Sequence, residues 1–115
     1  MIHEMKLHPL PFSQIAAGSK TIELRLLDEK RKRIRIGDAI VFTNTEDHTR
    51  SVQAQVIKLH IFANFDELYR SLPLLRCGYT PETVSRASSA DMEAYYTKQQ
   101  QARYGVLGIE LQLLD

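Results

Sequence analysis

Apolar and polar residues alternate along several short stretches of this chain, and this period-two pattern predicts β-strands. The clearest alternation runs from Thr21 to Leu26, where every second residue is apolar and faces one side of the strand. Thr21, Glu23 and Arg25 face the other side. Similar patterns predict further strands at residues 3–8, 39–42, 51–62 and 106–113.

The expected strand at 51–62 changes phase partway along its length. Its apolar residues fall on even positions up to Val56 and on odd positions from Ile57 to Ile61. Such a switch predicts a β-bulge or a sharp bend, which small barrels use to turn corners.

Capping residues and helical spacing predict short helices between the strands. Pro9 and Pro11 introduce the first helix, and Gly18 is placed to end it. Asn64 and Thr97 are each followed three residues later by a Glu or a Gln, a pattern typical of helix N-termini.

Strands dominate this pattern, and the helices are too short and irregular to act as repeated parallel crossovers. Residues 73–90, which contain two prolines, one glycine and several serines, are expected to form a long ordered loop over the body of the protein. We therefore predict an α+β fold, a small mixed β-barrel with short peripheral helices, that forms one domain over residues 1–115.

The composition is typical of a soluble globular protein, with 43% apolar and 25% charged residues. No apolar run approaches the roughly 18 residues that cross a bilayer, so no membrane partner is expected. The N-terminus lacks the apolar stretch that follows a basic start in a signal peptide. We expect a cytoplasmic protein.

Cysteine and histidine give no sign of a metal or cofactor site. Cys77 is the only cysteine, which rules out an internal disulfide and a cysteine-based zinc site, and we interpret it as a small packing residue. The four histidines lack metal-ligand spacing. We expect no bound metal and no cofactor.

The net charge of +1 conceals a strongly cationic segment. Residues 20–35 contain seven Lys or Arg against three Asp or Glu, and most of these cations lie in the run 30–35. Such an asymmetry favours an anionic, phosphate-bearing partner. The alternative is a solvated loop whose charges only maintain solubility.

Four motifs follow one another in a recognisable order. Gly-x-Lys-x-x-Glu-x-Arg at 18–25 precedes Asp-Glu-Lys at 28–30, Gly-Asp-Ala-Ile-Val-Phe at 37–42 and Tyr-Gly-Val-Leu-Gly-Ile at 104–109. In this order they resemble the activating signal cointegrator homology (ASCH) domain of the PUA-like barrel superfamily. The resemblance covers essentially the whole chain. It implies a PUA-like barrel with a cleft beside the first motif, and binding of RNA or a nucleotide-like ligand.

Some relatives in this family are small amidohydrolases that remove an acyl group from the exocyclic amine of a modified cytidine. They use a lysine, a threonine three residues later and a more distant glutamate. Lys20 matches the lysine, but Glu23 stands in the place of the threonine. Strand alternation argues that Thr21 cannot simply substitute, and the distant glutamate cannot be placed in this sequence. Catalysis is therefore the second hypothesis.

In the binding hypothesis, Lys20 and Arg25 contact a phosphate or a polar base edge. Glu23 either accepts from a base amino group or holds the two cations in position. The basic run steers and neutralises the RNA backbone, and Tyr95, Tyr96 or Tyr104 stacks on an unpaired base. The candidate binding residues are Lys20, Glu23, Arg25, Lys30, Lys32, Arg33 and Tyr96.

The sequence leaves other interpretations open. Glu23 and Arg25 lie on one strand face and could form a surface ion pair worth less than about 1 kcal/mol. In a metal-independent amidohydrolase or ribonuclease, Lys20 would act as a general base or stabilise an oxyanion, and Glu23 would transfer protons. The loop at 73–90 could instead present a protein-interaction surface.

Overall fold

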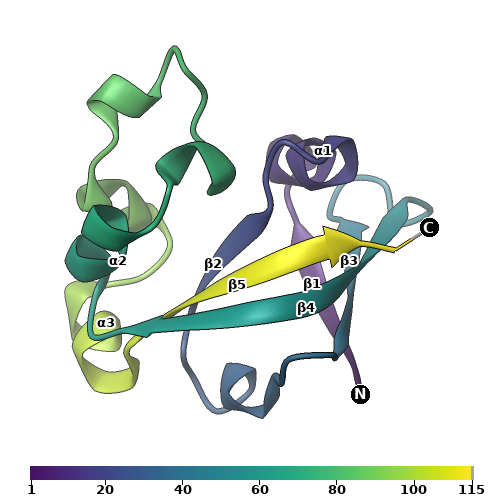
Figure 1. Ribbon diagram of the computed structural model, residues 1–115, viewed down its shortest axis with the longest axis horizontal. Helices are drawn as coiled ribbons and strands as arrows, with labels where there is room; N and C mark the ends of the chain where they lie inside the picture. The colour runs from purple at the N-terminus through teal and green to yellow at the C-terminus, as the bar shows by residue number, and fades with distance from the viewer. Residues whose placement is uncertain (115) are drawn as a thin grey trace.

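The computed structural model describes residues 1–114, which form a sheet surrounded by short helices. The strands and α-helices are β1 (Ile2–Leu7), α1 (Pro9–Ala17), β2 (Ile22–Leu26), β3 (Ala39–Asn44), β4 (Ser51–Phe62), α2 (Phe65–Ser71), α3 (Lys98–Tyr104) and β5 (Val106–Leu113). The five strands form one sheet in the order β1-β3-β4-β5-β2, which curls into a half-barrel (Figure 1). β1 is parallel to β3, and the other neighbours are antiparallel. This confirms the predicted α+β fold.

The sheet also confirms the change of phase in β4. Residues of β4 up to Gln55 pair with β3, whereas pairing with β5 continues to Phe62 at the far end. The register against β5 shifts between Val56 and Lys58. This bulge bends β4, which pairs with β3 near its start and with β5 up to its end, and the bend allows the sheet to curl.

The helices begin and end where the capping residues predict. α1 ends at Gly18, whose φ of 82° is a conformation that glycine adopts without strain. The Asn64 side chain accepts from the Glu67 backbone N–H at the start of α2, and Thr97 forms a capping box with Gln100 at the start of α3. None of the helices that the structure describes is long and apolar enough to cross a bilayer.

The long connection between α2 and α3 contains 3₁₀ turns at Leu74–Arg76, Val84–Arg86 and Ser89–Ala94. Together with α2 and α3 it forms a helical layer at one side of the sheet, on the left in Figure 1. The expected ordered loop at 73–90 is therefore confirmed, and it lies beside β2.

β2 packs one face against this helical layer. Ile22, Leu24 and Leu26, the apolar side of the predicted alternation, form a buried core with Phe65 and Leu68 of α2. A second and larger core fills the inside of the curled sheet. It consists of Met5, Leu7, Phe12, Ile15, Ile34, Ile40, Phe42, Ala54, Val56, Leu107, Ile109 and Leu111.

The opposite face of β2 points into the curled sheet. Glu23 pairs with Ile109 of β5 and Arg25 pairs with Leu107, and both partners belong to the larger core. Residues directly opposite each other in antiparallel strands share a face, so Glu23 and Arg25 lie on the inner side. The predicted alternation is confirmed, but the polar face of this strand is not a solvent face.

β1 and β2 are the two edge strands of the sheet. Arg25 Nη2 donates from β2 to the Lys6 backbone oxygen in β1, 3.1 Å away. A side chain thus bridges the opening between the two edges. We call this opening the seam.

Asp38, just before β3, joins the N-terminus to the sheet. Its carboxylate lies 2.8 Å from His3 Nε2 and 3.3 Å from the Met1 amine, and it accepts from the Arg35 backbone N–H at 3.0 Å. The hydrogen bond with His3 contributes most, and together these contacts lower the pKa of Asp38 from 3.8 to about 2.

The lowered pKa predicts a pH-dependent contribution to stability. Because the folded-state pKa is depressed, Asp38 stabilises the fold above its unfolded pKa, and this contribution is lost as the pH falls from about 4 toward 2. We expect Asp38→Asn to lower the urea midpoint at neutral pH and the difference from the wild type to shrink steadily below about pH 4. A difference that stays constant over this range would contradict the assignment.

Candidate functional site

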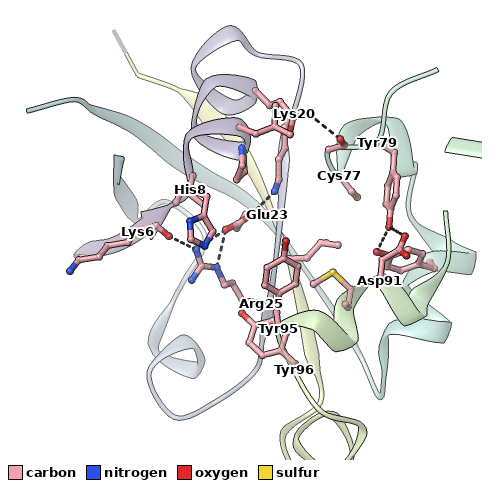
Figure 2. Close-up of a pocket in the computed structure, with 18 residues that line it drawn as sticks. Lys6, His8, Lys20, Glu23, Arg25, Cys77, Tyr79, Asp91, Tyr95 and Tyr96 are labelled. Atoms are coloured by element: carbon pink, nitrogen blue, oxygen red, sulfur yellow. Dashed lines mark hydrogen bonds and ion pairs between the residues drawn. The ribbon is translucent and has the colours of Figure 1, made fainter. Parts of the chain in front are cut away.

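A cleft of about 440 Å³ opens at the seam between β1 and β2 (Figure 2). One wall is formed by the end of β1 and the start of α1, another by β2, and a third by α2 and the connection that follows it. Ligand pockets in proteins typically measure about 300–1,000 Å³. The cleft is therefore large enough for a molecule the size of one nucleotide.

Lys20, Glu23 and Arg25 meet in this cleft. Lys20 Nζ lies 2.8 Å from Glu23 Oε1, and Arg25 approaches Glu23 Oε2 with Nη2 at 2.8 Å and Nε at 2.9 Å. Arg25 also makes the contact with Lys6 across the seam. One carboxylate thus holds two cations, one at each oxygen. We call these residues the trio.

The Glu23 carboxylate is buried, with only 3% of the residue exposed. Burial alone would raise the pKa of Glu23, but the charges and hydrogen bonds of Lys20 and Arg25 outweigh it and lower that pKa. The interpretation as a weak surface ion pair is therefore wrong. Because the trio combines two cations with one anion, it carries excess positive charge where the dielectric is low and attraction for an anion is strong.

Lys20 reaches the cleft because of the turn that follows α1. Gly18 ends the helix, and the Lys20 backbone N–H donates to the Gln14 carbonyl oxygen. β2 begins only at Ile22, so the direction of Lys20 is not fixed by the strand. Gly78 packs beside the aliphatic part of the Lys20 side chain. Its φ is 112°, and a Cβ added at this position would lie 3.5 Å from Lys20 Cδ, in van der Waals contact.

Two of the tyrosines considered for stacking line the cleft. Tyr96 stacks on Phe65 in the helical layer, with ring centroids 6.1 Å apart. Tyr95 lies beside it and is 66% exposed. Tyr104 packs against the smaller core instead. Tyr96 is thus part of the wall, and Tyr95 is the more accessible ring.

The basic run lies outside the cleft. Lys30, Lys32 and Arg33 are exposed around the 3₁₀ turn Arg31–Arg33, which follows β2. Lys32 forms an exposed pair with Glu29 at 3.3 Å, and such pairs contribute at most about 1 kcal/mol. The structure separates these three candidates from the other four, which line the cleft.

Tyr69, Tyr79 and Asp91 also line the cleft, although no sequence pattern indicated them. Tyr79 OH donates to Asp91 Oδ2 at 2.7 Å, and Tyr69 OH lies 2.7 Å from Tyr79 OH. They come from α2 and from the connection after it. The family resemblance covers the loop that carries Tyr79. This loop has no regular spacing of apolar and polar residues, so the side chains that face the cleft could not be identified from the sequence.

Cys77 lies in the same wall and is buried. Burial raises the pKa of the Cys77 thiol to about 11, against the opposing charge of Lys20. A thiol with that pKa is protonated at neutral pH and is a poor nucleophile. This supports the interpretation of Cys77 as a packing residue. Among the described residues, no group of three or more His, Cys, Asp or Glu is placed to hold a metal ion.

The cleft does not present the threonine nucleophile that the resemblance implies for an amidohydrolase. Thr21 Oγ1 is buried without a hydrogen-bond partner among the described residues, and Thr21 lines a different hollow beside β5. Glu23 binds two cations and has a lowered pKa, which makes it a poor proton acceptor. Both observations weigh against the hydrolase hypothesis.

Comparison with known proteins identifies related structures. A family model described as ASCH domain matches residues 5–115. The chain is similar to the crystal structure of hypothetical protein PH0355, with 28% identity over 99% of this chain and 100% of that chain and a TM-score of 0.80. It is also similar to the solution structure of protein PF0455 from Pyrococcus furiosus, with 26% identity over 100% and 99% and a TM-score of 0.75.

A more distant similarity confirms the fold. A mutant of ZmASCH from Zymomonas mobilis shares 12% identity over 99% of this chain and 75% of that chain, with a TM-score of 0.67. At such a low identity the similarity shows a shared fold and nothing more. No curated protein matches the chain.

Proposed function

The chain belongs to the ASCH domain family, and from this premise we propose that it binds single-stranded RNA or a nucleotide-like ligand in the cleft at the seam. The observation that carries the proposal is the buried trio of Lys20, Glu23 and Arg25, whose excess positive charge faces a cleft of nucleotide size. The family is generally associated with RNA binding, which agrees with this chemistry.

The two cations of the trio keep donors for a ligand. A lysine ammonium has three N–H groups and an arginine guanidinium has five, and Glu23 and the Lys6 carbonyl occupy only some of them. Arg25 suits a bidentate contact with a phosphate or a base edge, whereas Lys20 acts as a point charge. Because Glu23 already fixes both side chains, little conformational entropy is lost when a ligand binds.

Two further features extend the proposed site beyond the trio. Tyr95 and Tyr96 offer aromatic faces at the cleft, on which an unpaired base stacks. The exposed cations Lys30, Lys32 and Arg33 neutralise the phosphates of neighbouring nucleotides and steer the strand toward the seam. In this proposal the cleft binds one nucleotide, and the basic run binds the phosphate backbone of the neighbouring nucleotides.

We expect short single-stranded RNA to bind with an affinity that falls steeply between about 50 and 300 mM salt. The double variant Lys32→Glu and Arg33→Glu is expected to weaken binding of all sequences alike and to make the salt dependence shallower. Fluorescence anisotropy with labelled homopolymers measures both effects. A matched control is Arg86→Glu with Lys98→Glu, which reverses two exposed charges outside the cleft and the basic run.

The outcome that would refute this proposal is a folded protein that ignores RNA, DNA and nucleotides at low salt. Chromatography of the RNA after long incubation with the protein tests the hydrolase hypothesis. We expect the RNA to be recovered intact. A product that forms without added metal and is lost in Lys20→Ala would favour the hydrolase instead.

A further inference from the structure

The wall of the cleft opposite the trio contains a chain of hydrogen bonds whose protons point in one direction. Tyr79 OH donates to Asp91 Oδ2 at 2.7 Å. Because Tyr79 has a single hydroxyl proton, the 2.7 Å contact between the two hydroxyls requires Tyr69 to donate to Tyr79. The chain therefore runs from Tyr69 through Tyr79 to the Asp91 carboxylate. We call it the acceptor chain.

The surrounding structure holds this chain in place. Asp91 Oδ2 also accepts from the Ser88 backbone N–H at 3.2 Å, as part of a capping box at the start of the turn Ser89–Ala94. The rings of Tyr69 and Tyr79 meet edge to face, with centroids 5.8 Å apart. Burial, together with the hydrogen bond that Tyr79 donates to Asp91, raises the pKa of Tyr79 above its usual range, so its proton stays in the chain.

The acceptor chain offers lone pairs and no free proton to a ligand. Both hydroxyl protons are used inside the chain, and a carboxylate has only acceptors. Asp91 Oδ2 accepts the hydrogen bonds from the Tyr79 hydroxyl and the Ser88 N–H, and within the described residues Oδ1 accepts none. This oxygen is therefore open to a donor from a ligand.

The trio gives the other side of the cleft the opposite character. Lys20 and Arg25 present N–H donors and positive charge. Figure 2 shows Cys77 between Lys20 and Tyr79, where its buried thiol forms part of the cleft wall. The cleft thus has donors on one side and acceptors on the other.

We propose that the acceptor chain sets the ligand specificity of this cleft, by accepting hydrogen bonds from donor groups of a nucleotide whose phosphate lies at Lys20 and Arg25. This inference rests on the proposed function, and it specifies which chemical groups of the ligand the protein recognises. The donor is either the exocyclic amine of a base or a ribose hydroxyl, because a carboxylate accepts from both. A carbonyl oxygen in the same place would face the lone pairs of Asp91 and be rejected.

The test compares AMP, IMP and deoxy-AMP as ligands of the full chain at low salt, by calorimetric titration. IMP replaces the amine of adenine by a carbonyl oxygen, and deoxy-AMP lacks one ribose hydroxyl. We expect AMP to bind about tenfold more tightly than at least one of the other two, since the other ligand loses a charge-assisted hydrogen bond to the carboxylate. Weaker binding of IMP identifies the base amine as the donor, and weaker binding of deoxy-AMP identifies the ribose.

Two variants separate specificity from folding. Asp91→Asn keeps an oxygen for the Ser88 N–H and the Tyr79 hydroxyl, but it replaces the open acceptor by an N–H donor. We expect it to abolish the preference for AMP, and to favour IMP if the amine is the donor. Tyr79→Phe frees the Tyr69 proton to point into the cleft, and we expect it to reduce the same preference.

The outcomes distinguish this inference from the proposed function. Equal binding of the three nucleotides by the wild type, or ratios that both variants leave unchanged, would overturn the specificity role and leave the proposed function standing. Failure of all three nucleotides to bind at low salt would overturn this inference, and failure of RNA and DNA to bind as well would overturn the proposed function.

Discussion

Glu23→Gln is expected to lower the free energy of unfolding by about 3–5 kcal/mol, the usual cost of removing one partner from a buried ion pair. Glutamine keeps the shape of the side chain but removes the negative charge that Lys20 and Arg25 both contact. Two cations are then left close together in a buried place, without an anion. Urea unfolding at neutral pH, followed by circular dichroism, measures the loss.

A triple variant provides the control for this prediction. Lys20→Met, Glu23→Leu and Arg25→Met replace the whole trio by apolar side chains of similar volume, a change that is often neutral or stabilising. We expect it to recover most of the stability that Glu23→Gln loses. A loss below about 1 kcal/mol in Glu23→Gln would mean that water screens the trio like a surface pair, and the account of a buried site would be wrong.

Arg25→Met is expected to weaken mononucleotide binding roughly 10- to 150-fold, which corresponds to the loss of hydrogen bonds to a charged group worth about 1.5–3 kcal/mol. Lys20 stays beside Glu23 in this variant, so the carboxylate keeps one cation. Arg25→Lys retains the charge but loses the two-pronged geometry of the guanidinium, and an intermediate affinity is expected. Titration of the folded variants with AMP measures the effect.

Arg35→Met is the matched control for the loss of an arginine. Arg35 is exposed and lies in the loop after β2, outside the cleft. We expect this variant to bind a mononucleotide as the wild type does. If Arg35→Met and Arg25→Met weaken binding equally, the protein attracts nucleotides by its overall charge, and the cleft has no special role.

Local patterns in the sequence predicted the fold because each pattern reports a constraint that acts over a few residues. The phase change after Val56 predicted the bulge that bends β4, since side chains can alternate regularly only on a regular strand. Asn64 and Thr97 marked the starts of α2 and α3, because their side chains satisfy backbone N–H groups that a helix leaves free.

The burial of Glu23 could not be predicted in this way. An alternating strand in an antiparallel sheet normally has one solvated face. β2 differs because the sheet curls over its inner face while the helical layer covers its outer face. Tyr79 and Asp91 were missed for a related reason, because they lie in an irregular connection. Which of its side chains face the cleft depends on how the 3₁₀ turns pack against β2.

Glu23 is the position at which this chain departs from the amidohydrolase pattern that the family resemblance implies. That pattern has a threonine nucleophile there, whereas the carboxylate of Glu23 binds Lys20 and Arg25. A group that positions two cations serves recognition of an anion better than attack on a substrate. This departure is the strongest argument from a single residue for binding over catalysis.

A heteronuclear NMR titration with AMP at low salt tests the central claim most directly, because it locates the ligand on the protein. We expect the largest changes in amide shifts within residues 20–25, at Tyr79 and within residues 91–96, which surround the cleft. Shift changes confined to residues 30–35, or no changes at millimolar AMP, would contradict the claim that the seam of this barrel is a nucleotide-binding site.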